Sequence, residues 1–227
     1  LSRVPRGRKG IFLNTVVNAN TIFIGMPLNQ ALFGTEAISY FLVYYVLNTL
    51  STWTVGAVFI ARDGRTQGAG GGKVNLKQIL SPPILGLLAA LPVLLLGIHL
   101  PKPVTETLSY LGTLVTPLSL LYIGIVLSEA GLRSVRFDKD TVVALLGKFV
   151  LSPVLTATAL YLAMRCGIAL PAKLRDTMIV QSAVPALTVL PILAGDADGD
   201  VEYATNVVVT STVLFVVVIP LVMTLLK

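Results

Sequence analysis

The chain has 227 residues, of which 55% are hydrophobic and only 12% are charged. Because soluble domains carry roughly 25% charged residues, this composition excludes an ordinary soluble protein and predicts an all-α protein that crosses the lipid bilayer several times. The net charge of +6 does not indicate a nucleic-acid partner, since the basic residues gather at the ends of apolar segments without interleaved aromatic residues.

Seven apolar segments follow one another along the chain, and each is long enough to cross about 30 Å of hydrocarbon as a helix. A polar stretch at 62–79, which includes Gly68-Ala-Gly-Gly-Gly72, separates the second segment from the third and is typical of a flexible linker. The expected spans cover approximately 11–32, 36–61, 80–98, 104–127, 140–165, 173–194 and 202–226.

Lysines and arginines are concentrated on one side of this alternating path. They precede the first span, occur throughout the linker and precede the fifth span, whereas the loops on the opposite side carry fewer of them. By the positive-inside rule, this asymmetry predicts a protein of the cytoplasmic membrane with residue 1 on the cytoplasmic side and residue 227 on the extracytoplasmic side.

Two of the seven spans contain a polar, proline-bearing interruption, Asn18 to Pro27 in the first and Gln181 to Pro185 in the sixth. Proline removes a backbone donor and clashes with the preceding turn, so we expect each helix to break near mid-bilayer and to restart at Pro27 or Pro185. Irregular backbone at that depth survives only inside protein or beside a cavity. Two such helices in one chain indicate a transporter's binding site.

A half-helix that restarts at a break presents free amides and a positive dipole end, which favours a small organic anion as the substrate. The opposing interpretation is a non-transporting membrane sensor or interaction protein, in which neighbouring side chains pack two ordinary proline kinks shut. The candidate substrate-binding residues at the two breaks are Asn18, Asn20, Thr21, Pro27, Gln181, Ser182 and Pro185.

Lys148 is a basic residue inside a span, where a charge is costly and usually functional. We predict that it holds a carboxylate substrate or supplies a fixed countercharge, with snorkelling to the interface as the alternative. Ser152 lies at i+4 and would allow a Ser–Lys hydrolase pair, but no oxyanion-hole pattern accompanies it, so we expect no enzyme. One cysteine and one histidine exclude a Cys/His-rich metal site, and we expect neither a metal nor a cofactor.

A weak internal repeat links the two interrupted spans. Leu32-Phe-Gly34 and a turn with Glu36 follow the first break, and Leu193-Ala-Gly195 and a turn with Glu202 follow the second. The predicted orientation gives the two units opposite topology, as in inverted-repeat transporters. We therefore expect 1–61 to be the last two spans of a first five-span repeat, 62–79 a cytoplasmic linker and 80–227 a second repeat, with three further spans upstream.

The stretch Asn14-Thr-Val-Val-Asn-Ala-Asn-Thr-Ile-Phe-Ile-Gly-Met-Pro-Leu-Asn-Gln-Ala-Leu-Phe-Gly34 resembles the N-T-G-x-x-G-x-P-L…A-L-F-G signature of the auxin efflux carrier family. The stretch Val180-Gln-Ser-Ala-Val-Pro-Ala186 resembles that family's Q-S-A-M-P-A signature, and Lys148 followed by Pro153 is similar to its eighth span. The first glycine of the family pattern is absent here, and Val184 replaces the methionine. The resemblance covers essentially the whole chain, as the fourth to tenth of ten spans.

This resemblance implies a bile-acid-symporter-like fold of two inverted five-span units, whose fourth and ninth helices break and cross, with alternating access between a scaffold and a transport domain. Family members resemble permeases for malate and related dicarboxylates, or exporters of auxin, so the implied partner is a small organic anion. A coupling proton or sodium ion and assembly as a homodimer are left open. The implied crossover site consists of Asn18 or Asn20 with Pro27, and of Gln181, Ser182 and Pro185.

Overall fold

The computed structural model describes residues 4–64, 82–114, 117–118, 121, 124–125, 128 and 135–226, and these residues form helices, turns and loops without a strand. The first helices are α1 (Lys9–Val17), η1 (Thr21–Gly25), α2 (Met26–Phe33), η2 (Thr35–Ala37), α3 (Ile38–Ser51), η3 (Thr52–Gly56) and α4 (Ala57–Gly64). The later ones are α6 (Pro82–Leu95), α7 (Lys102–Thr113), α9 (Lys139–Leu146), η6 (Gly147–Leu151), α10 (Ser152–Arg165), α11 (Ala172–Ser182), α12 (Leu190–Asp196) and α13 (Val201–Leu225).

Four stretches of helix in the described residues are long and apolar enough to cross a membrane, and the first of them contains the interruption near Asn20. Together with the helical content, they confirm the prediction of an all-α polytopic membrane protein. The four stretches are Lys9–Phe33, Thr35–Gly64, Lys139–Arg165 and Val201–Leu225.

The other three expected spans contain shorter helices where the structure describes them. The helix α6 covers part of 80–98, α7 covers the start of 104–127, and α11 and α12 divide 173–194 between them. The count of seven spans and the inverted repeat therefore stay predictions. Most of the expected linker at 62–79 lies outside the described residues.

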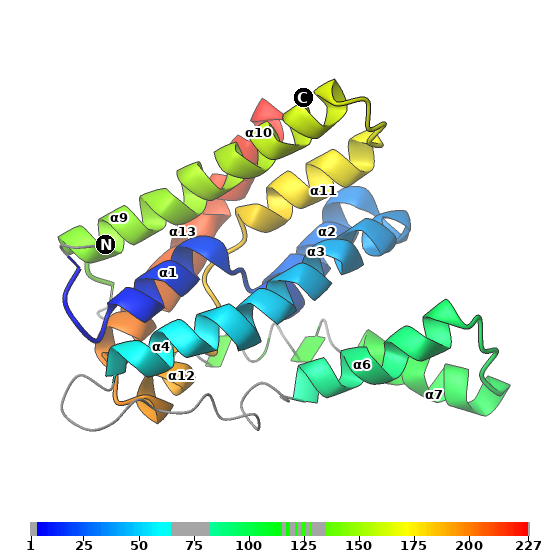
Figure 1. The fold of residues 1–227 in the computed structure, drawn as a ribbon, viewed down its shortest axis with the longest axis horizontal. Coiled ribbons are helices and arrows are strands. Elements are labelled where there is room, and N and C mark those ends of the chain that lie inside the picture. Colours follow the sequence, from blue (N-terminus) through cyan, green and yellow to red (C-terminus); the bar gives the residue numbers. More distant parts are fainter. Residues whose placement is uncertain are drawn as a thin grey trace.

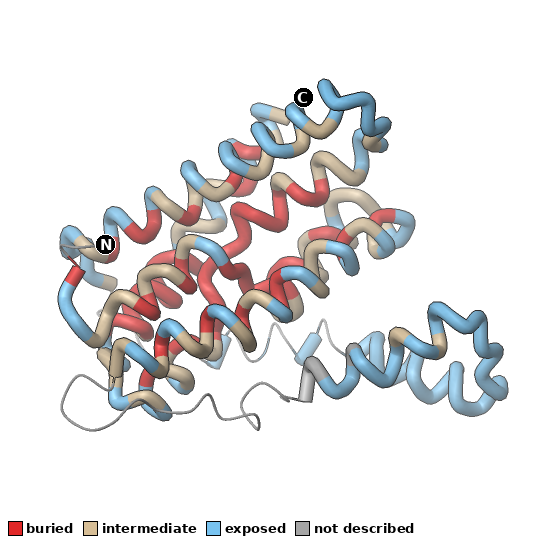
Figure 2. Tube along the Cα trace, viewed as in Figure 1, coloured by how far each residue is buried: buried red, intermediate tan, exposed pale blue. Residues whose placement is uncertain are grey.

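The two broken helices lie in the middle of the helical bundle. Figure 1 shows α9 and α10 as one long rod along the bundle, and α3 and α4 as another. Buried residues gather between these rods, on α1, α11, α13 and the segments that join the half-helices (Figure 2). Large apolar side chains are exposed on the outer faces of α10 and α13, as expected of helices that contact lipid.

An apolar cluster fixes one half of each broken helix. Ile11 of α1, Ile60 of α4, Leu190 of α12 and Val207 of α13 are buried members of this cluster. Gly10 permits the close approach of α1 to α4, because a Cβ at this position would lie 2.6 Å from the Ile60 Cα. Such close packing of small residues is what holds helices together in a bilayer, where lipid is as apolar as the side chains.

Pro27 and Pro153 lie inside continuous helices, each directly after a wide π turn. In both cases the residue before the proline donates its N–H to a carbonyl five residues back, rather than four. These turns allow the helix to pass Pro27 and Pro153, which lack a backbone donor. The expectation that a helix restarts at Pro27 is therefore wrong, because that helix begins at Thr21.

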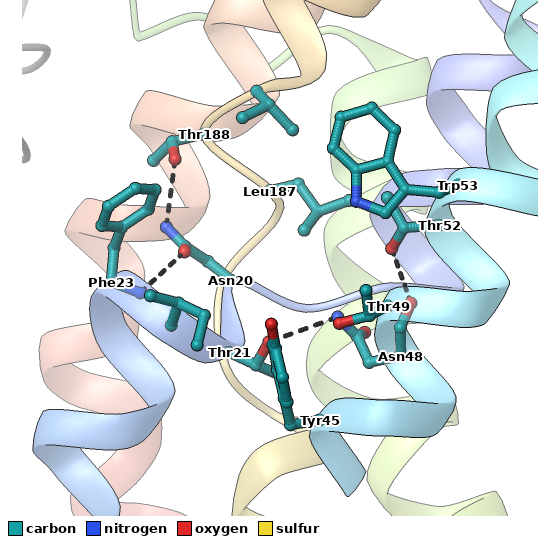
Figure 3. Close-up of a pocket in the computed structure, with 12 residues that line it drawn as sticks. Asn20, Thr21, Phe23, Tyr45, Asn48, Thr49, Thr52, Trp53, Leu187 and Thr188 are labelled. Carbon is teal, nitrogen blue, oxygen red and sulfur yellow. Dashed lines mark hydrogen bonds between the residues drawn. The ribbon is translucent and has the colours of Figure 1, made fainter. Parts of the chain in front are cut away.

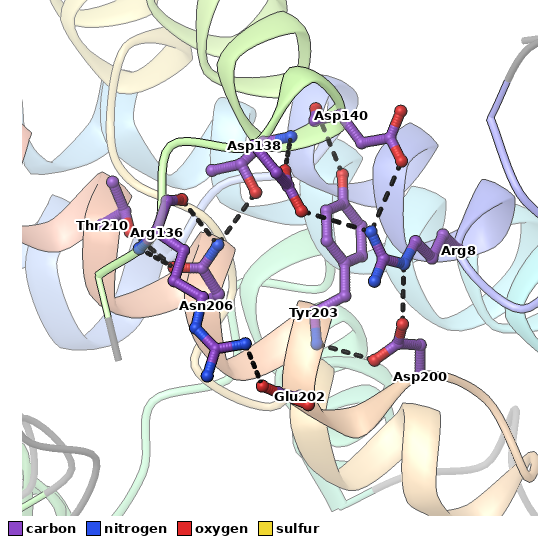
Figure 4. A network of polar contacts seen from close by, with 10 residues as sticks. Arg8, Arg136, Asp138, Asp140, Asp200, Glu202, Tyr203, Asn206 and Thr210 are labelled. Carbon is purple, nitrogen blue, oxygen red and sulfur yellow. Dashed lines mark hydrogen bonds and ion pairs between the residues drawn. The ribbon is translucent and has the colours of Figure 1, made fainter. Parts of the chain in front are cut away.

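A polar network around Arg8 holds one end of the bundle together (Figure 4). The guanidinium forms ion pairs with Asp138, Asp140 and Asp200 and lies 4.8 Å from the centre of the Tyr203 ring. Burial opposes this charge, but the hydrogen bond and charge of Asp200, and then the charges of Asp138 and Asp140, raise the pKa of Arg8 above its ordinary value. Segments that the sequence assigns to one side of the membrane thus meet at one end.

Asn206 provides a second anchor at this end. Its Oδ1 accepts the Arg136 N–H at 2.8 Å, and its Nδ2 donates to the Arg136 carbonyl at 2.9 Å and to the Thr141 hydroxyl at 2.9 Å. Asp138 begins α9 by accepting the Thr141 N–H at 2.7 Å. Burial would raise the pKa of Asp138, but the hydrogen bonds from Thr141, and then the charge of Arg8, hold it below its ordinary value.

Candidate functional site

The first broken helix is interrupted over three residues, Asn18 to Asn20. The helix α1 ends directly before Asn18, which is extended, and η1 starts at Thr21. Asn20 begins the new helix because its side-chain Oδ1 accepts the Phe23 N–H at 3.3 Å, as an N-cap residue does. The predicted break is confirmed, and it lies at the two asparagines rather than at Pro27.

The second broken helix is interrupted over a longer stretch, residues 183–189. The helix α11 ends at Ser182, and α12 begins at Leu190 with Pro191 in its first turn. Pro185 lies within the irregular segment, so the predicted restart at Pro185 is also wrong. Every residue from 183 to 188 is buried, as irregular backbone at membrane depth has to be.

The two interruptions cross in direct contact. The Asn20 N–H donates to the Pro185 carbonyl at 2.9 Å, so the two irregular segments are joined through their backbones. Beside this bond, the Asn20 amide donates to the Thr188 hydroxyl at 3.5 Å (Figure 3). On the α11 side, Gln181 Nε2 donates to the Gly25 carbonyl at 2.9 Å. The crossing that the family resemblance implies is therefore present.

Side chains from two neighbouring helices fix the backbone of the crossing. Asn48 of α3 binds both backbone groups of Ala19: its Oδ1 accepts the N–H at 2.8 Å and its Nδ2 donates to the carbonyl at 2.9 Å. The Ser211 hydroxyl of α13 accepts the Ala186 N–H at 3.1 Å in the second segment. These bonds satisfy backbone groups that no helix satisfies, which is costly to omit inside a protein.

A cavity of about 320 Å³ opens beside the crossing. Asn20 and Thr188 lie in its wall with Trp53 of η3 (Figure 3). The first turn of η1 and the residues just before α12 both border it, so the N-terminal ends of two half-helices face one space. The lining residues are uncharged: Asn20, Thr21, Ile22, Phe23, Tyr45, Asn48, Thr49, Thr52, Trp53, Leu187, Thr188 and Val189.

Lys148 lies behind the crossing and does not line this cavity. The residue is 0% exposed, and its ammonium donates to the Asn18 carbonyl at 3.0 Å. The nitrogen therefore stays inside the bundle, which rules out the snorkelling alternative. The expected contact with a carboxylate is not made through this cavity in the conformation described, and the bond to Asn18 does not support a hydrolase pair with Ser152.

Two buried amide oxygens at the crossing, Asn18 Oδ1 and Gln181 Oε1, have no hydrogen-bond partner among the described residues. Gln181 Oε1 faces the bare Cα of Gly25, where a Cβ would lie only 2.2 Å away. A larger residue at position 25 would force the Gln181 amide to shift. This contact joins the end of α11 to η1, which begins the second half of the first broken helix.

The predicted site residues thus separate into three groups. Asn20 and Thr21 line the cavity. Lys148 and Gln181 lie at the crossing and donate to backbone carbonyls there, whereas Asn18 accepts the Lys148 ammonium with its carbonyl and donates its side-chain amide to Asn14 Oδ1. The side chains of the remaining three form no bond between the broken helices: Ser182 donates to Ile179 of its own helix, Pro27 lies within a continuous helix, and Pro185 takes part only through its carbonyl, which accepts the Asn20 N–H.

Sequence reasoning missed the contribution of the second membrane helix to the site. Tyr45, Asn48, Thr49, Thr52 and Trp53 recur every three or four residues and therefore lie on one face of that helix. Polar residues at helical spacing in an apolar span were the available signal, but they are also typical of helix packing. Thr188 was missed because its segment was expected to be helical.

Comparison with known proteins agrees with this architecture. The model of a family described as membrane transport protein matches residues 2–223. An uncharacterized transporter from Methanothermobacter thermautotrophicus is 25% identical to the chain over 203 residues, which are 89% of this chain and 63% of that protein. The chain therefore spans less than two thirds of the length of this curated relative.

Proposed function

We propose that this chain, which belongs to the membrane transport protein family, contains the substrate site of a secondary transporter for a small organic anion such as a dicarboxylate or an auxin-like acid. The family match confirms the resemblance to auxin efflux carriers, and members of this family are transporters rather than enzymes. A location in the cytoplasmic membrane with residue 1 on the cytoplasmic side is part of the proposal, as are a coupling proton or sodium ion and a homodimer.

The observation that carries the proposal is the convergence of two helix N-termini on one cavity. Each half-helix that starts beside the cavity, η1 and α12, has a partial positive charge at its first turn. The N–H groups of Thr21, Phe23 and Leu190 already bond within the protein, so this partial charge is the attraction that the helix ends offer. In the low dielectric of a membrane protein, it attracts an anion more strongly than it would in water. A carboxylate placed between the two ends would contact both broken helices.

The wall of the cavity fits a small anion that also has an apolar part. Hydroxyl and amide groups of Asn20, Thr49, Thr52 and Thr188 provide neutral hydrogen-bonding groups, and no lining residue carries a negative charge that would repel a carboxylate. Trp53 and its aromatic neighbours give an apolar side to the same space. The volume of about 320 Å³ lies at the small end of the range for ligand sites.

The backbone bonds at the crossing suggest how binding would be linked to movement. Asn20 contacts the cavity with its side chain and the second segment with its N–H, so a ligand at the cavity acts directly on the contact between the two segments. Alternating access requires such a contact to have two arrangements, of which the ligand favours one at a time. Lys148 bonds to the Asn18 carbonyl at the same crossing.

The rival reading, a sensor with closed kinks, predicts side chains that fill the space beside the breaks. The cavity beside the crossing favours a transporter instead. Uptake of radiolabelled malate, malonate and indole-3-acetate into proteoliposomes separates the two readings. A transporter accumulates at least one of these carboxylates, and a sensor binds without moving any of them.

Variants of the cavity wall test the site itself. Asn20→Ala and Thr188→Val each remove a polar group, and we expect the KM for the transported carboxylate to rise about 10- to 100-fold, since a hydrogen bond to a charged group contributes about 1.5–3 kcal/mol. Thr224→Val is the matched control, because Thr224 is an exposed residue whose hydroxyl bonds to its own helix. Unchanged KM values in both cavity variants would contradict the proposed site.

A further inference from the structure

The Lys148 ammonium lies at the negative end of a half-helix. Lys148 is fully buried in η6, and its Nζ donates to the carbonyl of Asn18, the residue that directly follows α1. The last carbonyls of a helix have no partner within that helix and carry a partial negative charge of roughly −0.5 in total. The lysine therefore neutralises the open end of α1 at the crossing.

No carboxylate among the described residues forms an ion pair with this ammonium. The ion pairs found among the described residues join other side chains: Arg8 with Asp138, Asp140 and Asp200, Lys102 with Glu106, Arg136 with Glu202, and Lys173 with Glu36. A buried charge needs a compensating group, and here the described group is the carbonyl end of α1.

The other carbonyls of the first break already have donors. The Ala19 carbonyl accepts from Asn48, and the Asn20 carbonyl accepts from the N–H groups of Ile24 and Gly25. The Asn18 carbonyl is the one that takes the charged donor, and Oδ1 of the same residue is buried without a partner. Asn18 therefore offers two oxygens, one bonded to an ammonium and one unbonded, at the negative end of a helix.

Carbonyl oxygens at the C-terminal end of an interrupted membrane helix are ligands that suit a small hard cation such as sodium. We propose that the Lys148 ammonium is a tethered cation that occupies the place of a free sodium ion at Asn18, so the wild type binds no sodium at the crossing and removal of the ammonium creates a sodium site. This inference concerns ion occupancy alone and does not depend on which substrate is carried.

Lys148→Met tests the inference in the full-length protein reconstituted into nanodiscs. Methionine has about the length of the lysine stem without Nζ, so the Asn18 carbonyl loses its cation while the packing of the stem is kept. We expect sodium chloride, relative to choline chloride at equal ionic strength, to raise the Tm of this variant in a saturable manner. The rise should be about 3–6 °C at ten times the dissociation constant.

Three comparisons make the sodium result specific. The wild type, Lys148→Arg and the surface variant Lys102→Met keep a cation at the crossing, and their Tm should be the same in sodium and choline. Binding of radioactive sodium should appear only in Lys148→Met. If the wild type gains as much Tm from sodium as Lys148→Met does, or if folded Lys148→Met neither binds nor responds to sodium, the inference is wrong.

If Lys148→Met does not fold in either salt, Lys148→Ala provides a second test of the inference. Alanine leaves room for a whole ammonium group, so methylammonium should raise the yield and Tm of this variant, whereas tetramethylammonium, which cannot donate a hydrogen bond, should not. Equal behaviour in the two salts would overturn the inference. The proposed function is measured separately as carboxylate uptake by the wild type, so either result can fail without the other.

Discussion

The two interruptions meet at the crossing, but different contacts stabilise each of them. The first is three residues long and is held by side chains of other helices: Asn48 binds Ala19, and Lys148 binds Asn18. The second is seven residues long, is buried almost throughout, and has one described bond from its backbone to a side chain of another helix, that of Ala186 to Ser211. The first break therefore depends on a few polar contacts, whereas the second depends mainly on packing and on its backbone bond to the first.

The largest effect is expected from Asn48→Ala, which removes both bonds to the Ala19 backbone. Leaving a buried N–H without its acceptor should lower the free energy of unfolding by about 2–4 kcal/mol and lower carboxylate uptake at least tenfold, because the break also borders the cavity. Thermal unfolding in nanodiscs and uptake into proteoliposomes measure the two effects.

Asn206→Ala is the matched control for this prediction. Asn206 binds the Arg136 backbone in the same two-bond manner, but at the helix end and away from the cavity. Its loss should cost stability while uptake per folded molecule stays close to that of the wild type. Equal losses of uptake in the two variants would show that the crossing has no special role.

The contact between Gly25 and Gln181 allows a sharper test of how the two broken helices depend on each other. Gly25→Ala would bring a Cβ within 2.2 Å of Gln181 Oε1, and we expect a loss of about 1–3 kcal/mol from this overpacking. In the presence of Gln181→Ala the added methyl group has space, so the double variant should be no less stable than Gln181→Ala alone. Simple addition of the two single losses would contradict the contact.

A smaller effect is expected in the second break. Ser211→Ala removes the acceptor of the Ala186 N–H, and we expect a loss of about 1–2 kcal/mol, below that of Asn48→Ala. Ser211→Thr keeps a hydroxyl and serves as the control. If Ser211→Ala destabilises the protein more than Asn48→Ala does, the contrast between the two breaks is reversed.

The smallest effect lies outside the crossing, in the network at the helix ends. The folded-state pKa of Asp138 lies below its ordinary value of 3.8, so its contribution to stability is present above pH 3.8 and is lost as the pH falls through the folded-state pKa. The wild type should exceed Asp138→Asn in unfolding free energy at neutral pH by at most about 1 kcal/mol, and the difference should vanish under acid. A difference that grows as the pH falls would contradict this sign.

The sequence predicted the breaks better than it predicted their exact form. Asn18 and Asn20 mark the first break correctly because an asparagine can cap a helix and satisfy irregular backbone. The helix starts predicted at Pro27 and Pro185 were wrong. A π turn lets a helix continue past Pro27, and Pro185 lies inside a buried irregular segment. The first outcome depends on a local change in helix geometry and the second on long-range packing, and a simple proline rule contains neither.

Only some residues of the candidate site could be predicted from the sequence. Lys148 was recognised from its charge in an apolar span, but its partner, a backbone carbonyl of α1, has no sequence signal. Asn48, Thr49 and Trp53 line the cavity although they occur far from both motifs, because α3 and η3 pack beside the crossing only in the folded bundle. The polar residues at the breaks were predictable from the sequence, whereas the cavity wall formed by α3 and η3 was not.

The central claim is that a carboxylate binds in the cavity at the crossing, and Trp53 offers the most direct test of it. Trp53 is the single tryptophan of these 227 residues and lines that cavity. Its fluorescence should change saturably on titration with a carboxylate that the protein transports. The change should disappear in Trp53→Phe and need higher ligand concentrations in Asn20→Ala. A transported carboxylate that leaves Trp53 emission unchanged, or an equal change in Trp53→Phe, would contradict the account.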